Sequence, residues 1–129
     1  MENSLRKLVD IAKDKEMYPE VLKMLYSTLK DNEEHNNEIR RGLSLNVNCP
    51  IEILEKLSKD DLVDIRKNVA SHVHANEKIL QNCTKDSSKE VRYIAVQNLN
   101  VTEDILITFL KDEDEQVSLT ARKILKQRL

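Results

Sequence analysis

The sequence is poor both in residues that interrupt helices and in residues that build β-sheets. Its 129 residues include one Gly, two Pro, no Trp, three Tyr and one Phe. Sandwiches and barrels need Gly-rich turns and many aromatic or β-branched residues, so this shortage argues against both. Leu, Ile, Lys and Glu, which favour helices, are abundant. Composition and length together predict one all-α domain.

Cysteine and long apolar runs are also scarce. The only cysteines are Cys49 and Cys83, too few for a disulfide framework, and we expect both to be buried as small apolar residues. No apolar run approaches the roughly 20 residues that span a bilayer. The first 16 residues are charged throughout and lack the apolar stretch of a signal peptide. We therefore expect a cytoplasmic protein that does not bind membranes.

Signatures of catalysis and of metal binding are missing as well. There is no Gly-x-Gly-x-x-Gly, no Walker loop and no Gly-x-Ser-x-Gly. His72 and His74 could supply two metal ligands, but neither they nor His35 form a recognisable set of three or four. We expect no enzyme activity, no cofactor, no metal and no small-molecule substrate. The net charge of −2 gives no global attraction to nucleic acid.

What the sequence does contain is an internal repeat. The blocks 47–72, 73–98 and 99–124 align without gaps. The aligned apolar columns are Ile53/Ile79/Ile105, Leu54/Leu80/Leu106, Leu57/Cys83/Phe109, Ile65/Val91/Val117 and Val69/Ala95/Ala121. The aligned polar columns are Lys59/Lys85/Lys111, Asp60/Asp86/Asp112 and Arg40/Arg66/Arg92, with Ser118 replacing Arg in the last block. Repeats of this length indicate stacked supersecondary units.

A weaker copy precedes these blocks. Residues 18–25 resemble 49–57, and residues 38–46 resemble 64–72, with the front half displaced by about six residues. A longer connection is therefore expected at 31–37. The predicted organisation is a single domain over 1–129. It comprises an N-terminal capping helix in 1–16, a divergent repeat in 17–46, repeats at 47–72, 73–98 and 99–124, and a C-terminal end at 125–129.

The residue pattern predicts two short helices in each unit. N-caps place the start of the first helix near Pro50, Asn76 or Thr102. The second helix is expected to start at the column Asp61/Ser87/Glu113, where Ser87 and Glu90 form a capping-box pattern. The column Asn46/His72/Asn98 is expected to close it in a left-handed turn. Such a pair has one apolar face, which stacking on neighbouring pairs would bury.

The stretches CPIEILEKLSKDDLVDIRKNVASHV (49–73) and VTEDILITFLKDEDEQVSLTA (101–121) resemble the leucine-rich repeat variant family, which is similar in shape to HEAT and armadillo repeats. The resemblance covers roughly 18–124. It implies a short right-handed α-solenoid, or α-α superhelix, of about four helix pairs with a 26-residue period. Some members carry a Cys-rich iron–sulfur module at the N-terminus. No Cys precedes Cys49, so that cofactor is not expected.

The Arg and Asp columns allow two interpretations. They could form a structural ladder between neighbouring units, with Asp60, Asp86 and Asp112 paired to Arg66, Arg92 and their equivalents, which would fix the stacking register. Alternatively, the arginines could form an exposed row that contacts an acidic protein segment or follows a phosphate backbone. The lysine column has a simpler explanation, since cations favour helix C-termini.

The predicted function is non-enzymatic binding of a protein or peptide, with or without an acidic segment, through the curved face of the solenoid. The alternative is a HEAT-like solenoid that binds nucleic acid through its Arg and Lys columns. The candidate partner-binding residues are Arg40, Arg66, Arg92, Tyr93 and His72.

Overall fold

The computed structural model describes residues 3–29 and 36–129. Over these residues the fold is all-helical, with nine helices and no strand, as the composition predicts. The helices are α1 Asn3–Lys13, α2 Pro19–Ser27, α3 Asn37–Leu45, α4 Ile51–Leu57, α5 Val63–Ala70, α6 Glu77–Cys83, α7 Lys89–Val96, α8 Glu103–Phe109 and α9 Glu115–Arg128. None of the described helices combines the length and apolarity required to cross a bilayer.

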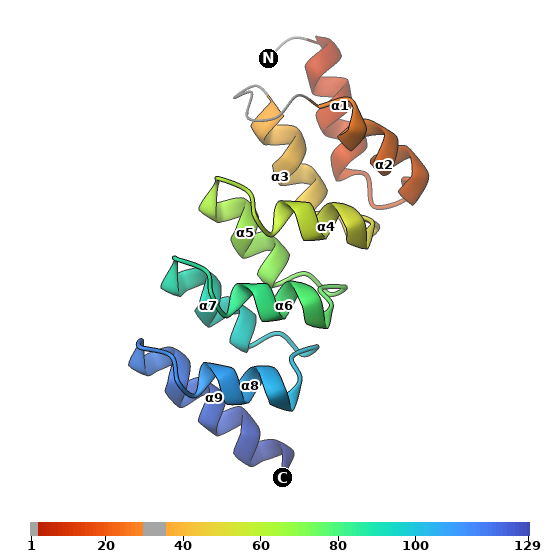
Figure 1. The fold of residues 1–129 in the computed structure, drawn as a ribbon. Helices are drawn as coiled ribbons and strands as arrows, with labels where there is room; N and C mark the ends of the chain where they lie inside the picture. Colours follow the sequence, from red (N-terminus) through yellow and green to blue (C-terminus); the bar gives the residue numbers. More distant parts are fainter. Residues whose placement is uncertain (1–2, 30–35) are drawn as a thin grey trace.

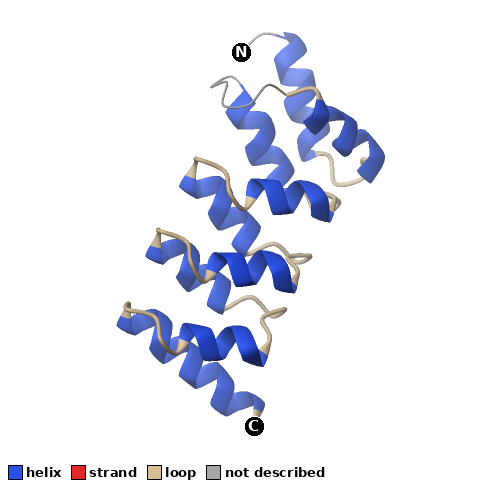
Figure 2. Ribbon diagram, viewed as in Figure 1, coloured by secondary structure: helices blue, strands red, loops and turns tan. Residues whose placement is uncertain are grey.

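The helices lie in two rows along an elongated molecule (Figure 1). One row contains α1, α3, α5, α7 and α9, each packed against the next, and the other contains α4, α6 and α8. Each member of the second row also packs against the helix that follows it in the chain, and α2 packs against α1. Short loops join the two rows (Figure 2), and α1 and α9 lie at opposite ends of the molecule.

The core runs the length of the molecule between the two rows. All fifteen side chains of the five aligned apolar columns are buried. A fully buried Leu or Ile contributes about 1.5–3 kcal/mol to the free energy of unfolding. Small residues bring backbones together where α3 crosses α1, because a Cβ added to Gly42 would lie 3.0 Å from Ala12 Cβ. The apolar columns therefore hold the helix pairs side by side.

The starts of the first helices agree with the sequence. Pro50, Asn76 and Thr102 are the N-caps of α4, α6 and α8, so that prediction is confirmed. The Asn76 side chain accepts the Ile79 N–H at 2.9 Å, and the Thr102 hydroxyl accepts the Ile105 N–H at 3.3 Å. These caps satisfy donors that the first helical turn leaves without a partner in the helix.

The starts of the second helices differ from the prediction. The N-caps of α5, α7 and α9 are Leu62, Ser88 and Asp114, one residue after the expected column. The reason is local, because the Asp60, Asp86 and Asp112 carboxylates each accept the N–H two residues later at 2.8–3.0 Å. This Asx turn holds the intervening residue outside the helix. The predicted Ser87–Glu90 capping box is wrong, and Ser88 takes the N-cap position instead.

The helix ends also differ. Asn46 caps α3 with φ −77° and ψ 123°, so its backbone is extended rather than left-handed. The caps of α5 and α7 are Ser71 and Gln97, one residue before the expected column. The side chains of that column instead contact backbone carbonyls that precede them by 26 to 34 residues. The longer connection expected at 31–37 falls mostly on residues outside the described ranges, as does His35.

Candidate partner-binding surface

Three Arg–Asp pairs connect consecutive helix pairs, and we call them the Arg–Asp ladder. Arg Nε donates to Asp Oδ2 over 2.8 Å in Arg40–Asp60, 3.0 Å in Arg66–Asp86 and 2.9 Å in Arg92–Asp112. In the last two pairs, Nη2 also donates to Oδ1, at 3.3 and 3.4 Å. Each arginine lies on a helix of the longer row, and each aspartate lies in the turn of the next unit. The fork geometry ties neighbouring units together.

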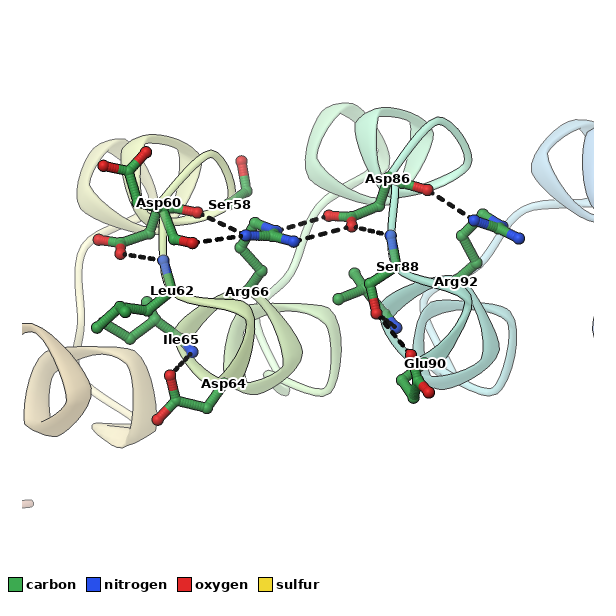
Figure 3. A network of polar contacts seen from close by, with 12 residues as sticks. Ser58, Asp60, Leu62, Asp64, Ile65, Arg66, Asp86, Ser88, Glu90 and Arg92 are labelled. Carbon is green, nitrogen blue, oxygen red and sulfur yellow. Dashed lines mark hydrogen bonds and ion pairs between the residues drawn. The ribbon is translucent and has the colours of Figure 1, made fainter.

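Two of these arginines, Arg66 and Arg92, also hold the turn of their own unit. Arg66 Nη1 donates to the Asp60 carbonyl at 2.9 Å, and Arg92 Nη1 donates to the Asp86 carbonyl at 2.8 Å. Figure 3 shows Arg66 between the Asp60 turn and the Asp86 carboxylate, whose Oδ1 accepts the Ser88 N–H. Arg66 and Arg92 therefore each fix a turn and a stacking contact at once.

The ladder is largely shielded from solvent. Its arginine side chains are 9–16% exposed and its aspartates 5–8% exposed. Guanidinium groups that are buried and paired with carboxylates are poorly placed to contact a partner. Arg40, Arg66 and Arg92 are therefore ladder residues, and they do not form an exposed row for a partner.

A second set of side chains links the loops of consecutive units. Asn46 Nδ2 donates to the carbonyls of Ala12 and Asp14, and Asn98 Nδ2 donates to those of Ala70 and His72, all at 2.8–3.0 Å. Two residues further along, Asn48 and Asn100 bind the preceding loop in the same way. The recurring Asn-x-Asn pattern is the available sequence signal, but sequence reasoning identifies only its first column, and as a helix end.

His72 occupies the Asn column and is buried. Its Nε2 lies 2.7 Å from the Asn46 carbonyl, and its Nδ1 accepts the His74 N–H at 3.0 Å. Both contacts suit a neutral ring with the proton on Nε2. Burial lowers the pKa of His72, opposed by the Asn46 hydrogen bond and assisted by the charge of His74. His72 is therefore a structural residue, and it also leaves the candidate binding set.

The two cysteines lie in the core. Cys49 and Cys83 are buried, as predicted. Burial raises the pKa of each thiol to about 12, with smaller effects from Glu52 and Asp86, so both stay protonated at neutral pH. Among the described residues, no group of three or more His, Cys, Asp or Glu side chains is placed to hold a metal ion.

On the exposed side of the longer row, one repeat position holds a different side chain in each unit. Between α3 and α5, Arg41 donates to Asp64 at 2.6 Å and also pairs with Glu38. The positions equivalent to Arg41 in the later units hold Lys67, Tyr93 and Leu119. Tyr93, the remaining candidate, is half-buried against the core. Unlike the ladder columns, this column differs in every unit, so packing does not fix its identity.

An apolar groove lies at the edge where α7 meets the flanking loops, and we call it the edge groove. It encloses about 460 Å³ and is lined by Ser71, Val73, Ile94, Gln97, Asn98, Leu99 and Asn100. Val73 is 60% exposed and Leu99 is 94% exposed, although Val101 nearby is buried. Solvent-exposed Leu and Val side chains beside a hollow are typical of interaction sites.

A scan against protein-family models, a search of curated proteins and a search of solved structures each gave no match. The resemblance to the leucine-rich repeat variant family therefore stays a prediction. Functional inference for this chain rests on its own residues.

Proposed function

We propose that this chain is a short right-handed α-solenoid with a 26-residue period, similar to leucine-rich repeat variant and HEAT-like proteins, and that it binds a protein or peptide without catalysing a reaction. The observation that carries the proposal is the edge groove. Val73 and Leu99 expose large apolar side chains that the core does not require. Transfer of such side chains from water to a partner is favourable by about 25 cal/mol per Å².

The two-row arrangement supports this function. The helices of the longer row pack more extensively against one another than α4, α6 and α8 do, which favours a stack that curves toward the longer row. Curved stacks of helix pairs offer extended binding surfaces. The groove opens beside α7 of this row, so a partner lying along the row would reach it.

Nucleic-acid binding is the second candidate. Lys59, Lys85 and Lys111 are exposed at one edge, 26 residues apart. Exposed acidic side chains stand two residues after Lys59 and Lys111, at Asp61 and Glu113. This mixture of signs gives a phosphate backbone little net attraction. The ladder arginines, which the nucleic-acid hypothesis also needs, are paired with carboxylates and largely shielded from solvent.

Affinity capture from source cells, with and without nuclease, tests the function when four proteins are compared. These are the wild type, Val73→Asp, Leu99→Asp and a matched control, Ile107→Asp. Ile107 is 47% exposed on α8 and lies outside the groove. We expect the wild type and Ile107→Asp to capture the same partner proteins, with or without nuclease. Val73→Asp and Leu99→Asp should not capture them. Equal recovery with all four, or loss of every captured protein on nuclease treatment, would contradict the proposal.

A further inference from the structure

The basic residues are unevenly distributed along the chain. Residues 119–129 contain four of the 21 basic residues and none of the 23 acidic residues. Arg122, Lys123 and Lys126 lie on α9 within two turns, and all three are exposed. Together with Leu119 and Gln127 they line a hollow of about 350 Å³. We call Arg122, Lys123 and Lys126 the α9 basic face.

A structural role accounts for only one residue of this face, Lys126. Cations in the last turn of a helix offset its dipole, and Lys126 and Arg128 occupy that turn. Arg128 also donates to the Val101 carbonyl at 2.6 Å and reaches Glu103 at 3.5 Å. Arg122 and Lys123 precede the last turn. Within residues 3–29 and 36–129, the side chains of the basic face find no hydrogen-bond or ion-pair partner.

The repeat spacing and the packing of α7 against α9 place the basic face beside the edge groove. Lys123 occupies in α9 the position that Gln97 occupies in α7, and Gln97 lines the groove. Helices α7 and α9 pack against each other, and packed helices lie about 8–10 Å apart. An extended peptide advances about 3.3 Å per residue. About three residues of peptide would therefore connect a side chain in the groove to one beside Lys123.

We infer that the partner segment is an acidic peptide, with a large apolar side chain in the edge groove and carboxylates on the α9 basic face about three residues away. This inference rests on the proposed function and adds the chemistry of the partner. The exposed apolar groove gives the anchor its favourable contact, and the unpaired cations give charge complementarity. A nucleic acid would match the cations, but its phosphates would gain nothing from Val73 and Leu99.

A random library of 12-residue peptides displayed on phage tests the inference. We expect wild-type protein to enrich peptides that carry an aromatic or large aliphatic residue and Asp or Glu about three positions away. One selected peptide, labelled with a fluorophore, is then titrated against Lys123→Glu/Lys126→Glu. We expect its affinity to fall by about 5- to 30-fold at low salt, because two surface attractions become repulsions.

The matched control is Lys85→Glu/Lys111→Glu, which makes the same charge change at exposed positions outside the α9 basic face and the edge groove. Its affinity should stay within about twofold of wild type, and circular dichroism checks that both variants fold. Enrichment of peptides without acidic residues, or equal affinity for both variants, would overturn the acidic-peptide inference and leave the binding function standing. Enrichment of no peptide would overturn the binding function and the inference together.

Discussion

The substitution Arg66→Ala probes the Arg–Asp ladder at its most connected position. It removes two hydrogen bonds to the Asp86 carboxylate and those to the Asp60 and Asp61 carbonyls. Asp86 is only 8% exposed and would keep the Ser88 N–H as its hydrogen-bond donor. Breaking a buried pair costs about 3–5 kcal/mol. Since Arg66 is 16% exposed, we expect a loss of about 2–4 kcal/mol, to be measured by urea denaturation followed by circular dichroism.

Two comparisons make this measurement specific. Arg41→Ala breaks a more exposed pair, in which the side chains of Arg41 and Asp64 are 33% and 52% exposed, and should cost less than about 1 kcal/mol. In Arg66→Ala/Asp86→Ala no carboxylate is left without its partner, so the double variant should lose less than the two single losses added together. An unchanged urea midpoint for Arg66→Ala, or strict additivity in the double variant, would refute the ladder as a stabilising element.

Three further predictions follow from the geometry. Asn98→Ala leaves the Ala70 and His72 carbonyls without their donor. In urea denaturation it should lower the free energy of unfolding by about 1–3 kcal/mol. The control Asn82→Ala, at an exposed position of α6, should lower it by less than about 0.5 kcal/mol. The pKa of His72 in the folded state lies below its unfolded value of about 6.5, so its contribution to stability is present above pH 6.5 and is lost as pH falls through the folded pKa. Between pH 7.5 and pH 5.5, the free energy of unfolding should therefore fall more for wild type than for His72→Gln. Equal decreases in the two proteins would contradict this. Leu99→Asp should leave the thermal midpoint within about 2 °C of wild type, since Leu99 is 94% exposed; a larger drop would show that Leu99 supports the fold.

Features set by local sequence could be predicted well. The all-helical class follows from composition, and the first-helix caps Pro50, Asn76 and Thr102 follow from residue preferences at helix starts. The burial of Cys49 and Cys83 follows from their apolar surroundings. Such features depend on residues close together in the chain, which a single sequence displays directly.

Features that need a neighbouring unit were harder to predict. The second helices begin one residue late because Asp60 and its equivalents bind the backbone themselves. The sequence predicts that Asn46 and His72 close helices. It does not reveal their hydrogen-bond partners, because these lie 26 to 34 residues away in the chain.

The candidate surface was the hardest feature to predict. Leu99 is exposed and Val101 is buried, yet both are aliphatic residues in the same loop. Composition alone cannot separate them, because the path of the loop decides which side chain meets the core. The α9 basic face is visible in the sequence as a run of basic residues, but a single sequence does not show which of them have partners in the fold.

The most direct test of the binding surface is a ¹⁵N-labelled NMR titration of the chain with a peptide selected from the library. We predict that amide shifts concentrate at residues 71–73, 94–100 and 119–127, which form the edge groove and the α9 basic face. Shifts concentrated instead on α4, α6 and α8 would contradict the account, because they would place the partner on the opposite row of helices.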